Sequence, residues 1–165
     1  MTNLNEIYGE TLVKSLKGER GHIPIERALS DIDFELAGKR INELPYTIYE
    51  QVNHMLYWQD KFLEFLQGRQ PDMPTSVKET WPEEDKPQNQ EEWETIINRL
   101  LLGVEKACEI AMTVKLNEPL EKWPTEHKAG ILRNMASHNS YHLGEIVLMR
   151  RLFRAWPPPG GGYPA

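Results

Sequence analysis

Two histidines near the C-terminal end of the chain, His138 and His142, are spaced four residues apart. On a helix, residues at this spacing lie one above the other, with Cβ atoms about 6 Å apart. Two imidazoles held in this way can bind the same metal ion through bonds of about 2.0–2.1 Å. The other interpretation is a pair of core histidines hydrogen-bonded to neighbouring helices. The pair therefore indicates either a metal site or a buried polar network.

A carboxylate, Glu145, follows His142 by three residues and so falls on the same helical face. It could orient a histidine ring or act as a general base, which makes it the candidate catalytic residue. It could instead form a structural ion pair with Arg150 or Lys61. The sequence alone leaves these interpretations open.

These polar residues belong to a stretch, residues 131–153, with the pattern of an amphipathic helix. It contains no proline, and Gly144 is its only interior glycine. Its apolar residues share one arc with the histidines: Ile131, Met135, Ile146, Met149 and Phe153. An isolated buried polar group costs about 1–3 kcal/mol unless a partner satisfies it. Neutral imidazoles buried together need a shared partner, and this favours a metal.

Further helices are expected over residues 4–17, 25–44 (in one or two pieces), 46–67 and 91–115. Ser30 is the expected N-cap within the second of these ranges, and Thr125 is expected to cap the last helix. The expected inward side of the first helix is a stripe of seven residues. These are Leu4, Ile7, Tyr8, Thr11, Leu12, Ser15 and Leu16.

A third histidine, His54, lies on the flank of the apolar stripe of residues 46–67, near Trp58 and Phe65. It is either a boundary histidine with one edge in water or a third ligand presented to the last helix. Residues 69–90, with four prolines, form a connection longer than most in a compact domain. Such a length can cross a helical bundle and make the flanking helices parallel. Trp81 is expected to attach this crossover to the core.

Four long helices without a strand signal predict an all-α fold, a four-helix bundle with a long crossover between the second and third long helices. The expected organisation is a single domain over residues 1–156 and a Pro/Gly-rich tail over residues 157–165. Three neutral histidines with a fourth position open is the arrangement of a catalytic zinc-type site.

The composition excludes several classes of protein. The net charge is −6 with no Lys/Arg-rich run, so no nucleic-acid partner is expected. No window approaches 18 consecutive apolar residues, so no membrane span is expected. The single cysteine, Cys108, excludes an internal disulfide, and the N-terminal residues lack a signal peptide pattern, which together indicate the cytoplasm. Cys108 itself reads as a packed thiol, and His22 and His127 read as exposed histidines.

Three stretches carry a resemblance to a known family. They are GHIPIERAL through ELAGKRINELP, then YTIYEQVNHMLYW with His54 followed four residues later by Trp58, and finally HNSYHLGEIVLMRRLFRAWPPP. Together they resemble the DinB/YfiT-like proteins over nearly the whole chain. The third stretch is the most specific, because it has two histidines, a glycine, a Gln or Glu, and a Trp-Pro ending.

This resemblance implies a four-helix bundle, often a homodimer, with one divalent metal ion on His54, His138 and His142. Nickel, zinc and other ions occur in such sites, and imidazole ligands alone do not choose among them. Glu145 stands where glutamine is common in relatives. His22 resembles a loop histidine of some relatives, without an assigned role.

The resemblance further implies a small-molecule substrate, because some relatives transfer low-molecular-weight thiols to electrophiles. The expected function is a metal-dependent thiol S-transferase, in which the metal activates a thiolate. The alternatives are a hydrolase that uses metal-bound hydroxide and a non-catalytic metal-binding or stress-response protein. A metal-free bundle with a histidine network is the remaining possibility.

Overall fold

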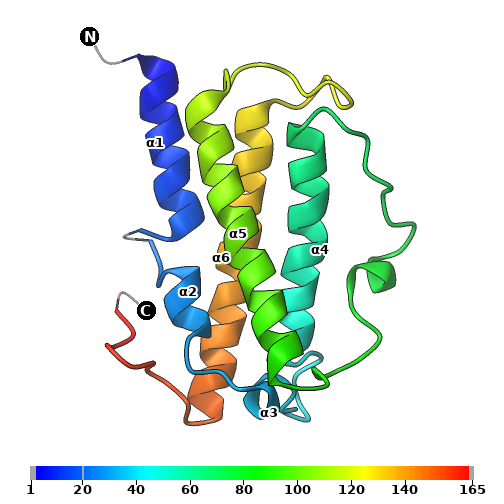
Figure 1. Cartoon of the computed structure of the whole chain (residues 1–165), viewed down its shortest axis with the longest axis vertical. Coiled ribbons are helices and arrows are strands. Elements are labelled where there is room, and N and C mark those ends of the chain that lie inside the picture. The colour runs from blue at the N-terminus through cyan, green and yellow to red at the C-terminus, as the bar shows by residue number, and fades with distance from the viewer. Residues whose placement is uncertain (1–2, 20, 164–165) are drawn as a thin grey trace.

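The computed structural model describes residues 3–19 and 21–163, and every regular element among them is a helix (Figure 1). The prediction of an all-α fold is therefore confirmed. The helices are α1 (Leu4–Lys17), α2 (Ile25–Leu29), α3 (Phe34–Ala37), α4 (Ile48–Leu66), the 3₁₀ helix η1 (Val77–Thr80), α5 (Gln90–Thr113) and α6 (Lys128–Leu152). None of the described helices is both long enough and apolar enough to cross a membrane.

Four long helices, α1, α4, α5 and α6, form a bundle (Figure 1). Each of α4 and α1 packs against both α5 and α6, so α4 and α1 occupy opposite corners. In Figure 1, α1 and α6 run downward, whereas α4 and α5 run upward. The helices α4 and α6 are therefore antiparallel neighbours, and they carry the three candidate histidines.

The segment between α4 and α5, residues 67–89, passes along the outside of the bundle from the end of α4 to the start of α5 (Figure 1). This path allows α4 and α5 to run in the same direction. The segment is not without structure, since η1 lies in its middle and contacts α4. The part of the segment before α5 is attached to the start of α4, because the Thr47 hydroxyl donates a hydrogen bond to the carbonyl oxygen of Asp85 at 2.7 Å.

The start of α4 is fixed by a capping box. The Thr47 hydroxyl accepts from the Glu50 backbone N–H, and the Glu50 carboxylate accepts from the Thr47 N–H. These two bonds satisfy backbone donors that a helix start leaves free. They set the register of the helix that carries His54.

Two predicted caps are wrong. Ser30 ends α2 rather than starting a helix, because the chain turns at Asp31 with a left-handed φ of 58°. The next helix, α3, is capped by Asp33 instead. Thr125 does not cap α6, because residues after it still pair with the preceding loop through the Lys128 N–H and the Glu118 carbonyl at 3.0 Å. The helix can begin only at Lys128.

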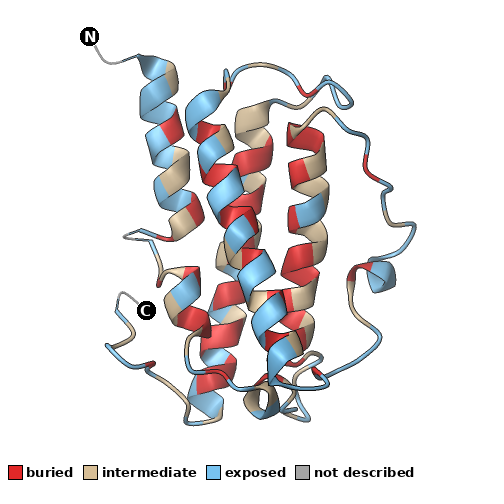
Figure 2. Cartoon of the chain, in the orientation of Figure 1, coloured by how far each residue is buried: buried red, intermediate tan, exposed pale blue. Residues whose placement is uncertain are grey.

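The core lies between the four long helices, where buried residues face one another (Figure 2). The predicted inward stripe of α1 is wrong in its first half, since Leu4 is 67% and Tyr8 59% exposed. Gly9 is buried instead, and a Cβ atom there would lie 2.6 Å from the Ala111 carbonyl oxygen. This close approach to α5 shifts the core-facing side of α1 away from Leu4 and Tyr8, whereas Leu16 at the end of the predicted stripe is buried.

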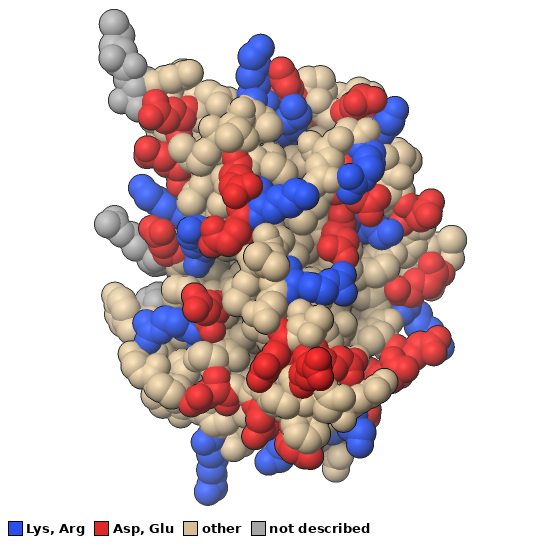
Figure 3. All heavy atoms as spheres, in the orientation of Figure 1, with Lys and Arg blue, Asp and Glu red and all other residues tan. Residues whose placement is uncertain are grey.

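The C-terminal tail is attached to the bundle. Arg27 of α2 donates hydrogen bonds to the carbonyl oxygens of Gly160 and Gly161. The parts of the predicted domain and tail at residues 1–2, 20 and 164–165 lie outside the described residues. Acidic and basic side chains are interspersed over the face seen in Figure 3.

Candidate metal centre

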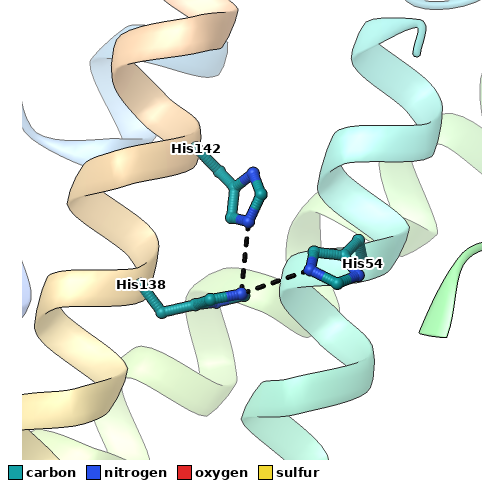
Figure 4. Close-up of side chains that lie close together, drawn as sticks. All are labelled: His54, His138 and His142. Atoms are coloured by element: carbon teal, nitrogen blue, oxygen red, sulfur yellow. Dashed lines mark hydrogen bonds between the residues drawn. The ribbon is translucent and has the colours of Figure 1, made fainter. Parts of the chain in front are cut away.

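The three histidines that the sequence singled out come together between α4 and α6. His54 lies in the second turn of α4, and His138 and His142 lie one turn apart on α6. Figure 4 shows the three rings pointing toward one another across the space between these helices. The Nε2 atom of His138 lies 3.3 Å from Nε2 of His54 and 3.2 Å from Nε2 of His142.

These separations fit ligands of one metal ion. Bonds of 2.0–2.1 Å in a tetrahedral site would place neighbouring nitrogens about 3.3 Å apart. Across the part of the chain that the structure describes, these histidines are the one group of three or more His, Cys, Asp or Glu side chains whose ligand atoms lie within 4.8 Å of one another.

The opposite ring nitrogens explain why the Nε2 atoms are free to bind. The Nδ1 of His54 lies 2.9 Å from the Thr80 carbonyl oxygen, which can only accept, so this nitrogen carries the proton. The Nδ1 of His142 faces the Gln51 amide oxygen at 2.6 Å and the Glu145 carboxylate at 3.0 Å. Both neutral rings therefore present an unprotonated Nε2 to the centre of the cluster.

A metal-free cluster leaves this arrangement unsatisfied. A proton on Nε2 of His138 can be donated to His54 or to His142, but not to both. At least one pair of nitrogen lone pairs then faces each other without a proton between them. A bound cation accepts all three lone pairs, so the donor set fits a divalent metal ion.

The pKa values of the three rings favour the same conclusion. Burial, His142 and His54 lower the pKa of His138 to about 3. Burial and His54 lower the pKa of His142 to about 4. Burial also lowers the pKa of His54, although the Thr80 carbonyl and Glu145 oppose this effect. All three imidazoles are therefore neutral near pH 7, which is the form that binds metal.

The crossover supplies an aromatic wall. The indole of Trp81 stacks on the His54 ring with centroids 4.0 Å apart, and its other face stacks on Tyr46 at 3.5 Å. Both pairs of rings are parallel within 6°. Trp81 was expected to attach the crossover to the core, and its contacts are with the candidate site itself.

Glu145 accepts a hydrogen bond from His142, as expected for a carboxylate that orients a ligand. The alternative partners are wrong: the Arg150 guanidinium donates to the carbonyl oxygens of Ala28 and Ala155, and the Lys61 ammonium lies over the ring of Tyr57. The Glu145 side chain is 39% exposed, so solvent reaches it. Its catalytic role stays a prediction.

Three residues at the site were not predicted from the sequence, namely Gln51, Thr80 and Tyr46. Only Gln51 gave a signal that could have identified it. Gln51 precedes His54 by three residues and therefore lies on the same inner face of α4. A polar side chain on such a face indicates a hydrogen bond to another buried group. Thr80 acts through its backbone carbonyl, which no side-chain pattern reveals. Tyr46 contacts the site only through Trp81, which lies far away in sequence.

The remaining candidates lie outside the cluster. The Nδ1 of His22 is 2.8 Å from the Ile23 carbonyl oxygen, and His127 is the exposed N-cap residue of α6. Cys108 is buried, and burial raises the pKa of its thiol to about 11. The prediction that Cys108 is packed in the core is confirmed, and a raised pKa disfavours the thiolate that a nucleophile needs.

Comparison with known proteins gives one match. A model of the DinB superfamily matches residues 25–146, a range that includes α2, most of α6 and all three histidines. Searches among curated proteins and among solved structures found no match.

Proposed function

Because the chain belongs to the DinB superfamily and directs three histidine nitrogens to one point, we propose that it binds one divalent metal ion there and catalyses thiol transfer. The ligands are His54, His138 and His142. The substrates are a low-molecular-weight thiol and an electrophilic small molecule. The observation that supports the metal site is the convergence of the Nε2 atoms. The Nδ1 protons of His54 and His142 are directed instead at hydrogen-bond acceptors outside the cluster.

A divalent ion held by these three histidines would lower the pKa of a thiol or water bound beside them. The chain's own residues prepare the site. Burial keeps the three imidazoles neutral, and Gln51 and Glu145 hold the proton of His142 on Nδ1. The fixed rings then need no reorganisation when the ion arrives.

Glu145 is the proposed acceptor for the proton that the thiol loses. Its carboxylate lies beside the cluster, 3.0 Å from Nδ1 of His142, and is partly exposed to solvent, so it can pass the proton outward. The sulfur then forms a bond to the electrophilic carbon, and the leaving group departs with its bonding electron pair. Three imidazole ligands do not select between zinc and nickel, so the resident ion must be measured.

Metal content tests the first half of the proposal. Wild-type protein should hold one zinc or nickel ion per chain after reconstitution, and His54→Ala, His138→Ala or His142→Ala should each reduce occupancy by at least tenfold. His127→Ala is the matched control, because this histidine lies outside the cluster. Equal metal content in all four variants would remove the proposed site.

A thiol-dependence assay tests the second half. The metal-loaded protein is incubated with an aryl chloride or an epoxide, with and without each of several low-molecular-weight thiols. Product that requires both metal and thiol supports the transferase. Cleavage of ester substrates without thiol would instead indicate the hydrolase, and no turnover in either assay would leave a non-catalytic metal-binding protein.

A further inference from the structure

The middle of the crossover touches the candidate metal centre through two consecutive residues. The Thr80 carbonyl accepts the His54 Nδ1 proton, and the Trp81 indole covers one face of the same ring. We call residues 77–81 the strap. The indole is itself held between His54 and Tyr46, so the strap is anchored by an aromatic stack of three rings.

The rest of the strap makes little contact with the bundle. Val77 is 75% exposed, and Lys78 and Glu79 are exposed as well. Beside it lies a cavity of about 940 Å³, lined by Tyr46 and Glu50 and by residues 76–79 and 81–83. The strap is therefore fixed mainly at Thr80 and Trp81.

A histidine ring on a helix is not fixed by its backbone. Its χ2 rotation is broad and roughly two-fold, so a flip of the ring exchanges Nδ1 with Cδ2 and Nε2 with Cε1 and turns both nitrogens away from their partners. In this structure the Thr80 carbonyl selects the orientation that places the proton on Nδ1, and Trp81 restricts rotation of the ring plane. Together they direct Nε2 of His54 toward the other two histidines.

We propose that Trp81 is a positioning residue for His54, and that metal binding and docking of the strap stabilise each other. The inference rests on the proposed metal site but not on any reaction. Docking of the strap restricts rotation of the His54 ring before metal binds. Bound metal in turn keeps the Nδ1–H of His54 directed at the Thr80 carbonyl. Thermodynamic linkage requires the two effects to be equal: the factor by which docking raises metal affinity is the factor by which metal favours docking.

The test compares Trp81→Ala, the conservative Trp81→Phe and the control Trp123→Ala. Trp123 is also a loop tryptophan that packs on a phenylalanine, Phe65, but it does not contact the histidines. Zinc affinity is measured by competition with a chromophoric chelator. Docking is measured by tryptic cleavage after Lys78, the one lysine or arginine within residues 70–85, and by amide exchange of the strap, each with and without zinc.

In the wild type, zinc should slow cleavage after Lys78 about fivefold or more. Trp81→Ala should weaken zinc binding about tenfold, and zinc should no longer protect its strap. Trp81→Phe should restore much of both effects, and Trp123→Ala should behave like the wild type. If Trp81→Ala fails to fold, amide exchange of the wild type with and without zinc still decides the question.

Two failures are distinguishable. Wild-type protein that binds no zinc would remove the proposed metal site and the inference with it. Wild-type protein that binds zinc while Trp81→Ala binds it equally well, or while zinc leaves the strap unprotected, would overturn this inference alone.

Discussion

At the scale of single residues, the orientation of His142 depends on two acceptors that share one proton. Gln51 is buried and lies 2.6 Å from Nδ1, whereas Glu145 is partly exposed and lies 3.0 Å away. Gln51→Ala should therefore weaken metal binding about tenfold or more, and Glu145→Ala should have a smaller effect. Isothermal titration with zinc measures both.

The matched control is Asn53→Ala. Asn53 is next to His54 in sequence, but its side chain donates to the Tyr49 carbonyl oxygen within α4. Its replacement should leave zinc affinity unchanged. A loss of affinity equal to that of Gln51→Ala would mean that the helix, rather than the hydrogen bond to His142, controls the site.

The histidine pKa values predict how acid affects the metal-free protein. In the unfolded chain these rings bind a proton near pH 6.5, but in the folded protein His142 does so at about 4 and His138 at about 3. Between about pH 6.5 and 3 the unfolded state binds more protons than the folded state, so the stability from these rings is fully present above about pH 6.5 and decreases as pH falls toward 3. The thermal midpoint of chelator-treated protein should fall across this window.

The double variant His138→Phe/His142→Leu isolates the contribution of these rings. It lacks the two buried imidazoles, so its thermal midpoint should change less between about pH 6.5 and 4 than that of the wild type. If the thermal midpoints of the two proteins changed with pH in the same way, the rings would be protonated in the folded state as they are in the unfolded chain.

The sequence singled out the three histidines that come together, but not the groups that orient them. The spacing of His138 and His142 determines their geometry, because one helix carries both. The pattern of its own helix placed His54 at the boundary of the apolar stripe. His54 is buried in the structure because Trp81 covers it from the crossover, which the pattern of that helix does not reveal. Contacts made by a backbone carbonyl or by an irregular segment leave no periodic signal, so Thr80 could not be found from the sequence.

At the scale of elements, the end of α6 is tied to two other segments by one buried cation. Arg150 is 1% exposed, and it donates to the Ala28 carbonyl at 2.6 Å and to the Ala155 carbonyl at 3.0 Å. Arg150→Met should lower the free energy of unfolding by about 2–4 kcal/mol, because it leaves two carbonyl oxygens without their donor. Urea unfolding measures the change.

Arg151→Met is the control for this prediction. The guanidinium carbons of Arg150 and Arg151 lie 5.4 Å and 5.9 Å from the ring centroid of Trp156, but the Arg151 side chain is exposed. Its loss should change the free energy of unfolding by less than about 0.5 kcal/mol. Similar costs for the two variants would indicate that contact with Trp156, rather than the buried hydrogen bonds, stabilises this end of α6.

The first helix shows where periodicity is insufficient. Its apolar residues suggested one inward face, but α1 lies close to α5 at Gly9, which is outside that predicted face. Asn5 supports that side by donating to the Val114 carbonyl and accepting from the Leu116 N–H. A glycine and an asparagine carry no apolar signal, so the sequence could predict the helix but not its rotation.

At the scale of the whole molecule, the candidate site joins segments that are distant in the chain. His54 and His142 are 88 residues apart, and they meet only when α4 and α6 pack as antiparallel neighbours. In the unfolded chain, only the pair on one helix can approach its native spacing. A metal ion that needs all three ligands therefore binds the folded state in preference to the unfolded one.

This preference predicts that metal stabilises the whole bundle. The gain is RT ln(1 + [M]/Kd), or about 2.7 kcal/mol when free metal exceeds Kd a hundredfold. The thermal midpoint of the wild type should rise on addition of zinc and return on addition of chelator. In His54→Ala and in His138→Ala the shift should be largely lost, although these histidines lie on different helices, whereas His127→Ala should keep it. If neither zinc nor chelator changed the thermal midpoint of the wild type or of any variant, the histidines would form a buried polar network without metal.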